Sequence, residues 1–191
     1  MSEIFLSASV PVIGRGEYEQ FSDPFLIQIA VRELVGAAIR DHSLVWGGHP
    51  AITPMIWAVC EDIGVRYETS VILYQSEFFR RTYPTENDNF SNIITVPSVR
   101  DDREASLLAM RNAMLSRPSL AAAVFVGGMD GVEEEHRIFR QYHATAPVFA
   151  LGSTGGAARK LALSLADHEH KRLTSVDFAG IFLTELLPLL R

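Results

Sequence analysis

The sequence has very little cysteine and no long apolar run, and each shortage excludes a class of protein. Among its 191 residues only Cys60 is a cysteine, so the chain cannot form an internal disulfide. No strongly apolar run approaches the roughly 20 residues that a membrane-spanning helix needs. The N-terminal segment MSEIFLSASV lacks the basic start and the long apolar stretch of a signal peptide. We therefore expect a cytoplasmic protein that does not interact with membranes.

Basic residues are also too few for a typical nucleic-acid-binding protein. Lysine and arginine total 17, aspartate and glutamate total 23, and the formal net charge is −6. Proteins that bind nucleic-acid backbones usually present a strongly basic face, so we expect no nucleic-acid partner. A phosphate group can still bind locally, because backbone N–H groups and one or two arginines suffice.

The chain does contain a regular alternation of two kinds of segment. Strand-like apolar segments fall at residues 4–9, 43–46, 70–74, 92–96, 121–126 and 147–151. Helical spacing of apolar residues falls at residues 25–40, 51–62, 101–115, 132–142, 157–166 and 176–190. The alternation predicts an α/β fold, a Rossmann-like three-layer sandwich whose mostly parallel sheet is flanked by helices. With 48% hydrophobic residues, residues 1–191 suit a single domain.

Two of the predicted helices carry start signals. Asp23 is placed to cap the first helix, and Pro24 suits its first position. Ser98 or Asp101 is expected to cap the helix that begins near residue 101. Cys60 lies within the apolar pattern of the second helix, so we expect a small buried hydrophobic residue there and not a reactive thiol.

Two further segments allow alternative interpretations. Residues 75–91 are polar and leave the carboxyl end of the third strand, where open α/β sheets bind ligands. A segment of that length is either disordered or functional. The apolar helix at residues 176–190 packs either on the sheet or on another subunit, and both explain its sequence equally well.

Glycine pairs follow three of the predicted strands, and each pair precedes a predicted helix. The pairs are Gly47-Gly48, Gly127-Gly128 and Gly155-Gly156. All three loops open at the carboxyl edge of the sheet, where glycine lets the backbone approach a phosphate and the next helix offers free N–H groups. We therefore expect a phosphate-bearing, nucleotide-type ligand. The loops match neither the dinucleotide fingerprint nor the Walker A motif.

The residues expected to bind this ligand lie on the three glycine loops and at the end of the first strand. They are Ser7, Ser9, Gly47, Gly48, His49, Gly127, Gly128, Met129, Asp130, Gly131, Gly152, Ser153, Thr154, Gly155 and Gly156. The hydroxyls of Ser153 and Thr154 either bond phosphate oxygens or cap the following helix. His49 either contacts the ligand or has no chemical role.

Residues 127–135, GGMDGVEEE, resemble the P-G-G-x-G-T-x-x-E motif of the LOG proteins. Those proteins are cytokinin-activating phosphoribohydrolases of the SLOG superfamily, whose Rossmannoid domains bind nucleotides. Residues 45–55 are similar to the superfamily's glycine loop after the second strand. Residues 152–158 resemble the late loop of SLOG sensor domains in bacterial anti-phage systems. The motifs occur in the same order, over roughly residues 4–165.

The resemblance implies a catalytic pair, Arg111 and Glu135. Arg111 precedes Gly127 by 16 residues, a separation similar to that in the LOG proteins. Arg111 would carry the substrate phosphate or the departing charge. Glu135 would position or deprotonate water, or stabilise an oxocarbenium-like sugar. Without the resemblance, the alternative interpretation is that Arg111 is a salt-bridged surface residue. Glu135 is then an acidic residue that stabilises the start of a helix through its dipole.

The chain departs from the LOG pattern at several positions. Asn112 replaces the lysine beside the arginine, Val126 replaces the leading proline, and Val132 replaces the threonine. Asp130 is inserted before Gly131. These departures preserve a nucleotide pocket and weaken the expectation of hydrolysis.

Three functions remain open on these grounds. The chain is a module that binds or senses an NAD-, ADP-ribose- or cyclic-nucleotide-type ligand, with an effector protein as a partner. Alternatively it is a phosphoribohydrolase or N-glycosidase that cleaves nucleoside monophosphates, or an interaction protein with a vestigial pocket. The sequence shows no convincing metal-ligand spacing, and we expect no metal and no cofactor. The LOG resemblance implies a homodimer or a higher homo-oligomer.

Overall fold

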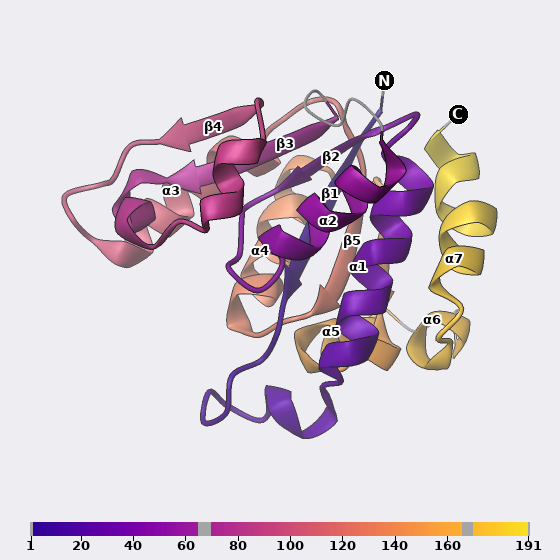
Figure 1. The fold of residues 1–191 in the computed structure, drawn as a ribbon. Helices are drawn as coiled ribbons and strands as arrows, with labels where there is room; N and C mark the ends of the chain where they lie inside the picture. The colour runs from indigo at the N-terminus through magenta and orange to yellow at the C-terminus, as the bar shows by residue number, and fades with distance from the viewer. Residues whose placement is uncertain (1, 65–69, 166–169, 191) are drawn as a thin grey trace.

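The structure is a computed structural model that describes residues 2–64, 70–165 and 170–190. At its centre lies a six-stranded sheet with the order β4-β3-β2-β1-β5-β6, and every strand pair is parallel (Figure 1). The strands are β1 (Glu3–Ser9), β2 (Ser43–Trp46), β3 (Val71–Ser76), β4 (Ile93–Val96), β5 (Leu120–Gly127) and β6 (Val148–Leu151). All six predicted strands are present, and the predicted α/β fold is confirmed.

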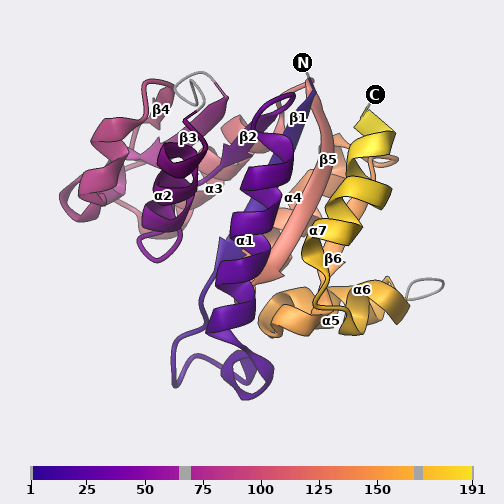
Figure 2. The ribbon, with the colours of Figure 1, turned by 45° about the vertical axis from the view of Figure 1, so that its right-hand side comes forward.

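The helices cover both faces of the sheet, which makes three layers (Figures 1 and 2). They are α1 (Pro24–Ala38), α2 (Thr53–Ile63), α3 (Arg103–Leu115), α4 (Asp130–Tyr142), α5 (Gly156–Ser164), α6 (His170–Thr174) and α7 (Phe178–Ile181). One face carries α1, α2 and α7, and the opposite face carries α3, α4 and α5. Within the described ranges, no helix is long and apolar enough to span a membrane.

The chain order of the strands creates a switch point beside β1. The chain moves outward from β1 through β2 and β3 to β4, and then returns to place β5 on the other side of β1. In open α/β sheets, ligands bind outside the carboxyl ends of the strands at such a point. The topology therefore predicts a ligand site at the carboxyl ends of β1, β2 and β5.

The hydrophobic core divides into two clusters, one on each side of the sheet. Side chains of a strand alternate between faces, so Ile4 and Leu6 face α1 and α2, whereas Phe5 faces α3 and α4. The C-terminal segment joins the first cluster through buried Phe178 and Phe182. The apolar side of this segment is thus covered within the chain, on the α1 side of the sheet. Homo-oligomerisation stays a prediction that rests on the LOG resemblance alone.

The start of α1 matches its prediction, whereas the start of α3 does not. Asp23 Oδ1 accepts hydrogen bonds from the N–H groups of Phe25 at 2.9 Å and Leu26 at 3.2 Å. The predicted cap of α3, Ser98 or Asp101, is wrong, because Asp102 accepts from the N–H of Ala105 at 2.8 Å. Asp101 has a φ of 55°, so the backbone turns there and delays the start of the helix.

The polar segment after β3 is ordered. It forms two 3-10 helices, η2 (Glu77–Thr82) and η3 (Thr85–Asn89). The Ser76 hydroxyl accepts from the N–H of Phe78 at 3.4 Å, and the Tyr83 hydroxyl donates to the Ser76 carbonyl at 2.7 Å. These bonds hold the segment against the carboxyl end of β3, so the segment is not disordered, and a functional role stays a prediction.

Candidate ligand-binding site

A cavity of about 610 Å³ opens at the carboxyl edge of the sheet. Its walls come from the ends of β1 to β3, the loop after β2, the segment after β3, and the facing parts of α3 and α4. The predicted site residues that line it are Ser7, Ser9, Gly47, Gly48, His49, Arg111, Met129, Asp130, Gly131 and Glu135. The structure therefore brings together two of the three glycine loops and both members of the predicted catalytic pair.

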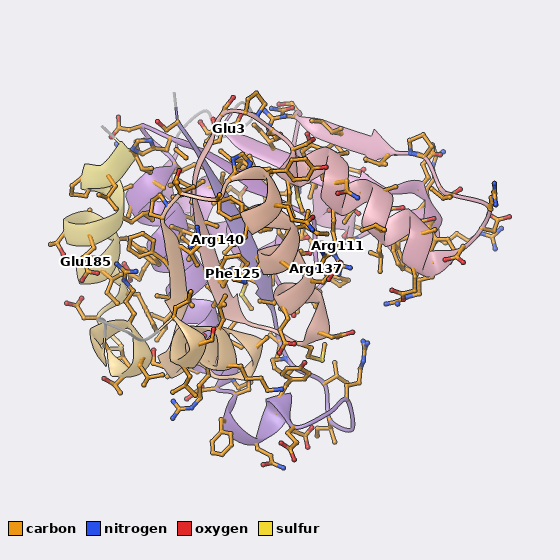
Figure 3. The ribbon with its side chains drawn as sticks, turned by 180° about the vertical axis from the view of Figure 1, so that it is seen from behind. Glu3, Arg111, Phe125, Arg137, Arg140 and Glu185 are labelled. Carbon is orange, nitrogen blue, oxygen red and sulfur yellow. The ribbon has the colours of Figure 1, made fainter. Side chains whose placement is uncertain are left out.

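Arg111 and Glu135 meet in the wall of this cavity. Arg111 reaches from α3 toward α4 (Figure 3), and its Nε lies 3.3 Å from Glu135 Oε1. The second carboxylate oxygen, Oε2, accepts from the Ser7 hydroxyl at 2.5 Å. The two charged side chains are only 14% and 17% exposed. Residues far apart in the sequence thus form one polar cluster, Ser7–Glu135–Arg111.

The surroundings of Glu135 change its acidity. Burial removes the carboxylate from water and raises the pKa of Glu135, while Arg111 and Ser7 partly oppose this effect. The neighbouring acids differ: Glu134 is bound by Arg137, which lowers the pKa of Glu134, and Glu133 accepts from the Tyr18 hydroxyl. Only one of the three consecutive glutamates is therefore built into the polar cluster.

The start of α4 supplies a place for an anion. The first N–H groups of a helix have no acceptor within the helix, and they carry the positive end of its dipole. Met129, Asp130 and Gly131, at this end, all line the cavity. A Cβ on Gly131 would lie 2.9 Å from Arg111 Nη2, so glycine lets the guanidinium lie close to the helix start. Asp130 adds a negative charge here, which Arg15 approaches to 3.7 Å.

The Gly127-Gly128 pair is not itself part of the cavity lining. The N–H of Gly127 donates to Thr154 Oγ1 at 2.8 Å, and the N–H of Gly128 donates to the Ser9 carbonyl at 2.8 Å. Both glycines have positive φ, and a Cβ on Gly127 would lie 2.8 Å from the Ser9 carbonyl oxygen. These glycines allow the backbone after β5 to approach the end of β1 closely. Their N–H groups are already hydrogen-bonded within the protein.

The late loop, Gly152 to Gly156, also lies outside the cavity lining. Thr154 is fully buried, and its hydroxyl donates to the Leu151 carbonyl at 2.6 Å. Ser153 donates to the Ser175 carbonyl at 2.7 Å, and neither hydroxyl caps α5. The N–H of Ala157 donates to the Gly128 carbonyl at 2.9 Å. Both hydroxyls are thus bonded to backbone carbonyls and neither caps α5, so the capping interpretation is wrong, whereas a contact with phosphate stays a prediction.

A sequence profile of the SLOG cluster3 family matches residues 17–186. The chain belongs to this family. Among solved structures, the chain is similar to the X-ray structure of TM1055, a Northeast Structural Genomics Consortium target, with a TM-score of 0.54. That similarity covers 85% of this chain and 81% of the other at 13% identity, so it supports the fold alone. No curated protein gave a match.

The SLOG cluster3 match includes Arg111 and Glu135 and begins after β1. Ser7, which bonds Glu135, therefore lies outside the matched range, and only the three-dimensional structure connects it to the pair. The described part of this SLOG protein holds no group of three or more His, Cys, Asp or Glu side chains suited to a metal ion.

Several cavity residues were not predicted from the sequence, and Trp46 and Gln75 are two of them. Both line the cavity and are nearly buried, with 2% and 5% exposure. Trp46 Nε1 and Gln75 Nε2 have no hydrogen-bond partner among the described residues. Gln75 had one usable signal, because it is a polar residue directly after the apolar run of the third predicted strand. Trp46 offered no signal beyond its place before a glycine pair.

His49 lines the cavity, and one hydrogen bond defines its tautomer. Its Nδ1 accepts a hydrogen bond from the N–H of Ala51 at 3.2 Å, which assigns the ring proton to Nε2. Burial lowers the pKa of His49. The ring is therefore neutral near pH 7, with its proton on Nε2.

Proposed function

We propose that this SLOG cluster3 protein binds a nucleotide-derived ligand of the NAD, ADP-ribose or cyclic-nucleotide type in the cavity, with a phosphate group at the start of α4. The observation that carries the proposal is the meeting of Arg111 with the α4 N-terminus at Gly131. Arginine offers five N–H donors, so its bond to Glu135 leaves others for phosphate oxygens. The cavity volume also falls within the usual range for small-molecule sites.

A thermal-shift screen tests this proposal. A ligand at about 100 times its Kd stabilises the folded state by about 2.7 kcal/mol, which corresponds to roughly 5–10 °C for a domain of this size. We expect such a rise with at least one of AMP, IMP, NAD, ADP-ribose and cyclic AMP. The Arg111→Met variant should lose the rise. No rise with any of these compounds would refute the proposal.

Arg137 supplies the matched control. Like Arg111, it forms an ion pair with a glutamate of α4, but it lies on the surface and does not line the cavity (Figure 3). Arg137→Met removes the same charge and should keep the full ligand-induced rise. An equal loss in both variants would assign the effect to net charge instead of the cavity.

A sensing role for this binding is the corresponding biological proposal. The resemblance of the late loop to SLOG sensor domains supports it, and such a role requires an effector protein that responds to the bound state. This role can be tested by co-purification. The proteins that co-purify with the chain are compared in the presence and in the absence of the ligand found by the screen.

The Ser7–Glu135–Arg111 cluster favours a second function, cleavage of the N-glycosidic bond of a nucleoside monophosphate. In that reaction water attacks C1′ of the ribose, the C1′–N bond breaks, and its electron pair leaves with the base, which takes up a proton. The Glu135 carboxylate is suited to accept the water proton or to stabilise the cationic sugar. To test this function, the protein is incubated with nucleoside monophosphates. The release of free base is then measured by chromatography.

A further inference from the structure

Each arginine that lines the cavity has an acidic partner. The pairs are Arg111 with Glu135, Arg103 with Glu104, and Arg15 with Asp130. The positive charge of every arginine in this wall is therefore balanced within the protein, although Arg111 keeps N–H donors to spare. A phosphate gains a net positive partner here only if one arginine leaves its acid, because burying an anion without a cation is strongly unfavourable.

The ion pairs differ in how readily they open. Arg111 and Glu135 are largely buried, so separating them would leave a buried charge without a partner. Arg15 and Asp130 are 52% and 73% exposed, and Arg15 Nη2 lies 3.7 Å from Asp130 Oδ1, too far for a hydrogen bond. Exposed pairs of this kind contribute little to stability. The Arg15–Asp130 pair therefore opens at a much lower cost than the buried pair.

Arg103 has more contacts to lose than Arg15. Its guanidinium is hydrogen-bonded to Glu104 and lies over the Phe79 ring, 5.9 Å from the ring centroid. Among the described residues, the side chain of Arg15 has neither a hydrogen bond nor a ring contact, and its weak ion pair is the contact that holds it. Arg15 is thus the arginine of the cavity wall that is most easily transferred to a ligand.

Asp130 occupies a place that also suits a phosphate. It is the first residue of α4, where the positive end of the helix dipole favours a negative charge. It is also the residue inserted before Gly131 relative to the LOG motif. An acid here competes with an incoming phosphate for the helix start and for Arg15. Because the Asp130 side chain is mostly exposed, it can turn into solvent and give up this place.

The loop keeps Arg15 near the α4 start without fixing its side chain. Gly14 and Gly16 flank Arg15, and a Cβ on Gly14 would meet nothing within 4 Å, so the chain is not packed there. Three residues further on, the Tyr18 hydroxyl donates to Glu133 Oε1 at 3.1 Å and ties the loop to α4. A small rotation of the Arg15 side chain is therefore enough to change its partner.

We propose that Arg15 is a ligand-binding residue that exchanges Asp130 for the phosphate group of the bound nucleotide. Asp130 then acts as an internal competitor that lowers the affinity of the site. The inference rests on the proposed function, because it takes the phosphate to lie at the start of α4. Arg15 lies outside the range that the SLOG cluster3 profile matches, so this residue extends the site beyond the matched segment.

Isothermal titration calorimetry of the full chain tests the exchange. The probe is the tightest binder among AMP, IMP, NAD, ADP-ribose and cyclic AMP, all of which carry phosphate. Arg15→Met keeps an unbranched side chain and removes the charge. It should weaken binding about tenfold, as expected for loss of a charge-assisted hydrogen bond. Asp130→Asn removes the competing charge and should tighten binding about threefold.

The double variant separates direct contact from charge screening. If Arg15 did no more than neutralise Asp130, the loss of Arg15 would matter only while Asp130 is charged. A direct contact with phosphate predicts that Arg15→Met weakens binding about tenfold in the Asp130→Asn background as well. Disappearance of the loss in that background would overturn the proposal.

Arg32 provides the matched control. Its Nη2 lies 3.8 Å from Asp62 Oδ2, the two side chains are 47% and 73% exposed, and neither lines the cavity. Arg32→Met should leave the affinity within about twofold of wild type, and a loss equal to that of Arg15→Met would overturn the proposal. Unchanged affinity in Arg15→Met would also overturn it while leaving the proposed function standing. Failure of wild type to bind any of the five compounds would instead overturn the proposed function, and this inference with it.

Discussion

The loop after β5 and the loop after β6 look alike in the sequence and differ in the structure. Each has a glycine pair, follows a buried strand and begins a helix. The first leads into the wall of the cavity at Met129 to Gly131, whereas the second, Gly152 to Gly156, is buried behind it. A glycine loop at the carboxyl edge of a sheet can therefore face a ligand cavity or support a neighbouring backbone, and only its contacts in the fold distinguish these two roles.

The largest expected effect is on folding, from Gly155→Ala in the late loop. Gly155 has a φ of +78°, and a Cβ there would lie 1.7 Å from the Phe21 carbonyl oxygen, which is backbone and cannot rotate away. We expect a loss of about 3 kcal/mol or more in the free energy of unfolding. Urea denaturation followed by circular dichroism measures it. A stability equal to that of wild type would contradict the assignment of this loop as a structural support.

The second prediction concerns catalysis on the cavity side. If base release is found, Glu135→Gln should reduce it at least about 100-fold, as expected when a general base or charged stabiliser is removed. Circular dichroism should show an intact fold. Glu133→Gln, on the same helix but bonded to Tyr18 at the surface, is the control and should retain the rate. Similar rates for Glu135→Gln and wild type would exclude Glu135 from the reaction.

The same reaction should depend on pH through Glu135. The role of Glu135 requires the ionised carboxylate, so the rate should fall as pH decreases through its pKa. Because burial raises the pKa of Glu135, the fall should begin at a higher pH than for an ordinary glutamate near 4.3. Arg111 opposes that rise, so Arg111→Met should move the midpoint of any remaining activity to still higher pH. A midpoint at the ordinary value would contradict this account.

A third and smaller effect is expected from Thr154→Val. The substitution keeps the side-chain shape and removes the hydroxyl that joins the Gly127 N–H to the Leu151 carbonyl. A buried N–H left unpaired costs about 1–3 kcal/mol, which should appear in the free energy of unfolding. Ligand affinity should change far less than stability. The reverse pattern would place Thr154 in the binding site.

The smallest effect on stability is expected from Gly131→Ala in the cavity loop. The added Cβ meets only Arg111 Nη2, the end of a flexible side chain, and alanine favours helix over glycine by up to about 1 kcal/mol. The fold should therefore lose less than about 1 kcal/mol. Affinity for the nucleotide found in the thermal-shift screen should fall about tenfold, because the guanidinium must shift. Calorimetry and urea denaturation together separate this pattern from that of Gly155→Ala.

The main elements of the fold follow from the sequence because their signals are local. The apolar strand runs, the helical spacing and the Asp23-Pro24 helix start each depend on neighbouring residues, and each matches the structure. The start of α3 shows the limit of such signals. Asp101 and Asp102 are equally suitable caps by residue type, and the backbone turn at Asp101 decides between them.

The candidate site was predictable in part. Arg111 and Glu135 came from a motif resemblance, and the structure places them in contact. The different positions of the loops after β5 and β6 relative to the cavity could not be predicted, because they depend on strand order. β6 lies at the edge of the sheet, one strand further from β1 than β5. Trp46 and Gln75 were missed for a related reason, since an unpartnered buried N–H exists only once the chain is folded.

The hydrogen bonds behind the Gly127-Gly128 turn have a consequence for how quickly and how tightly a ligand binds. The bonds from Gly127 to Thr154, from Gly128 to Ser9 and from Ala157 to Gly128 fix the approach to α4 before any ligand arrives. A ligand that enters the cavity then spends no binding energy on ordering this turn. Its association rate should accordingly follow simple second-order kinetics, without a slow phase from closure of this loop.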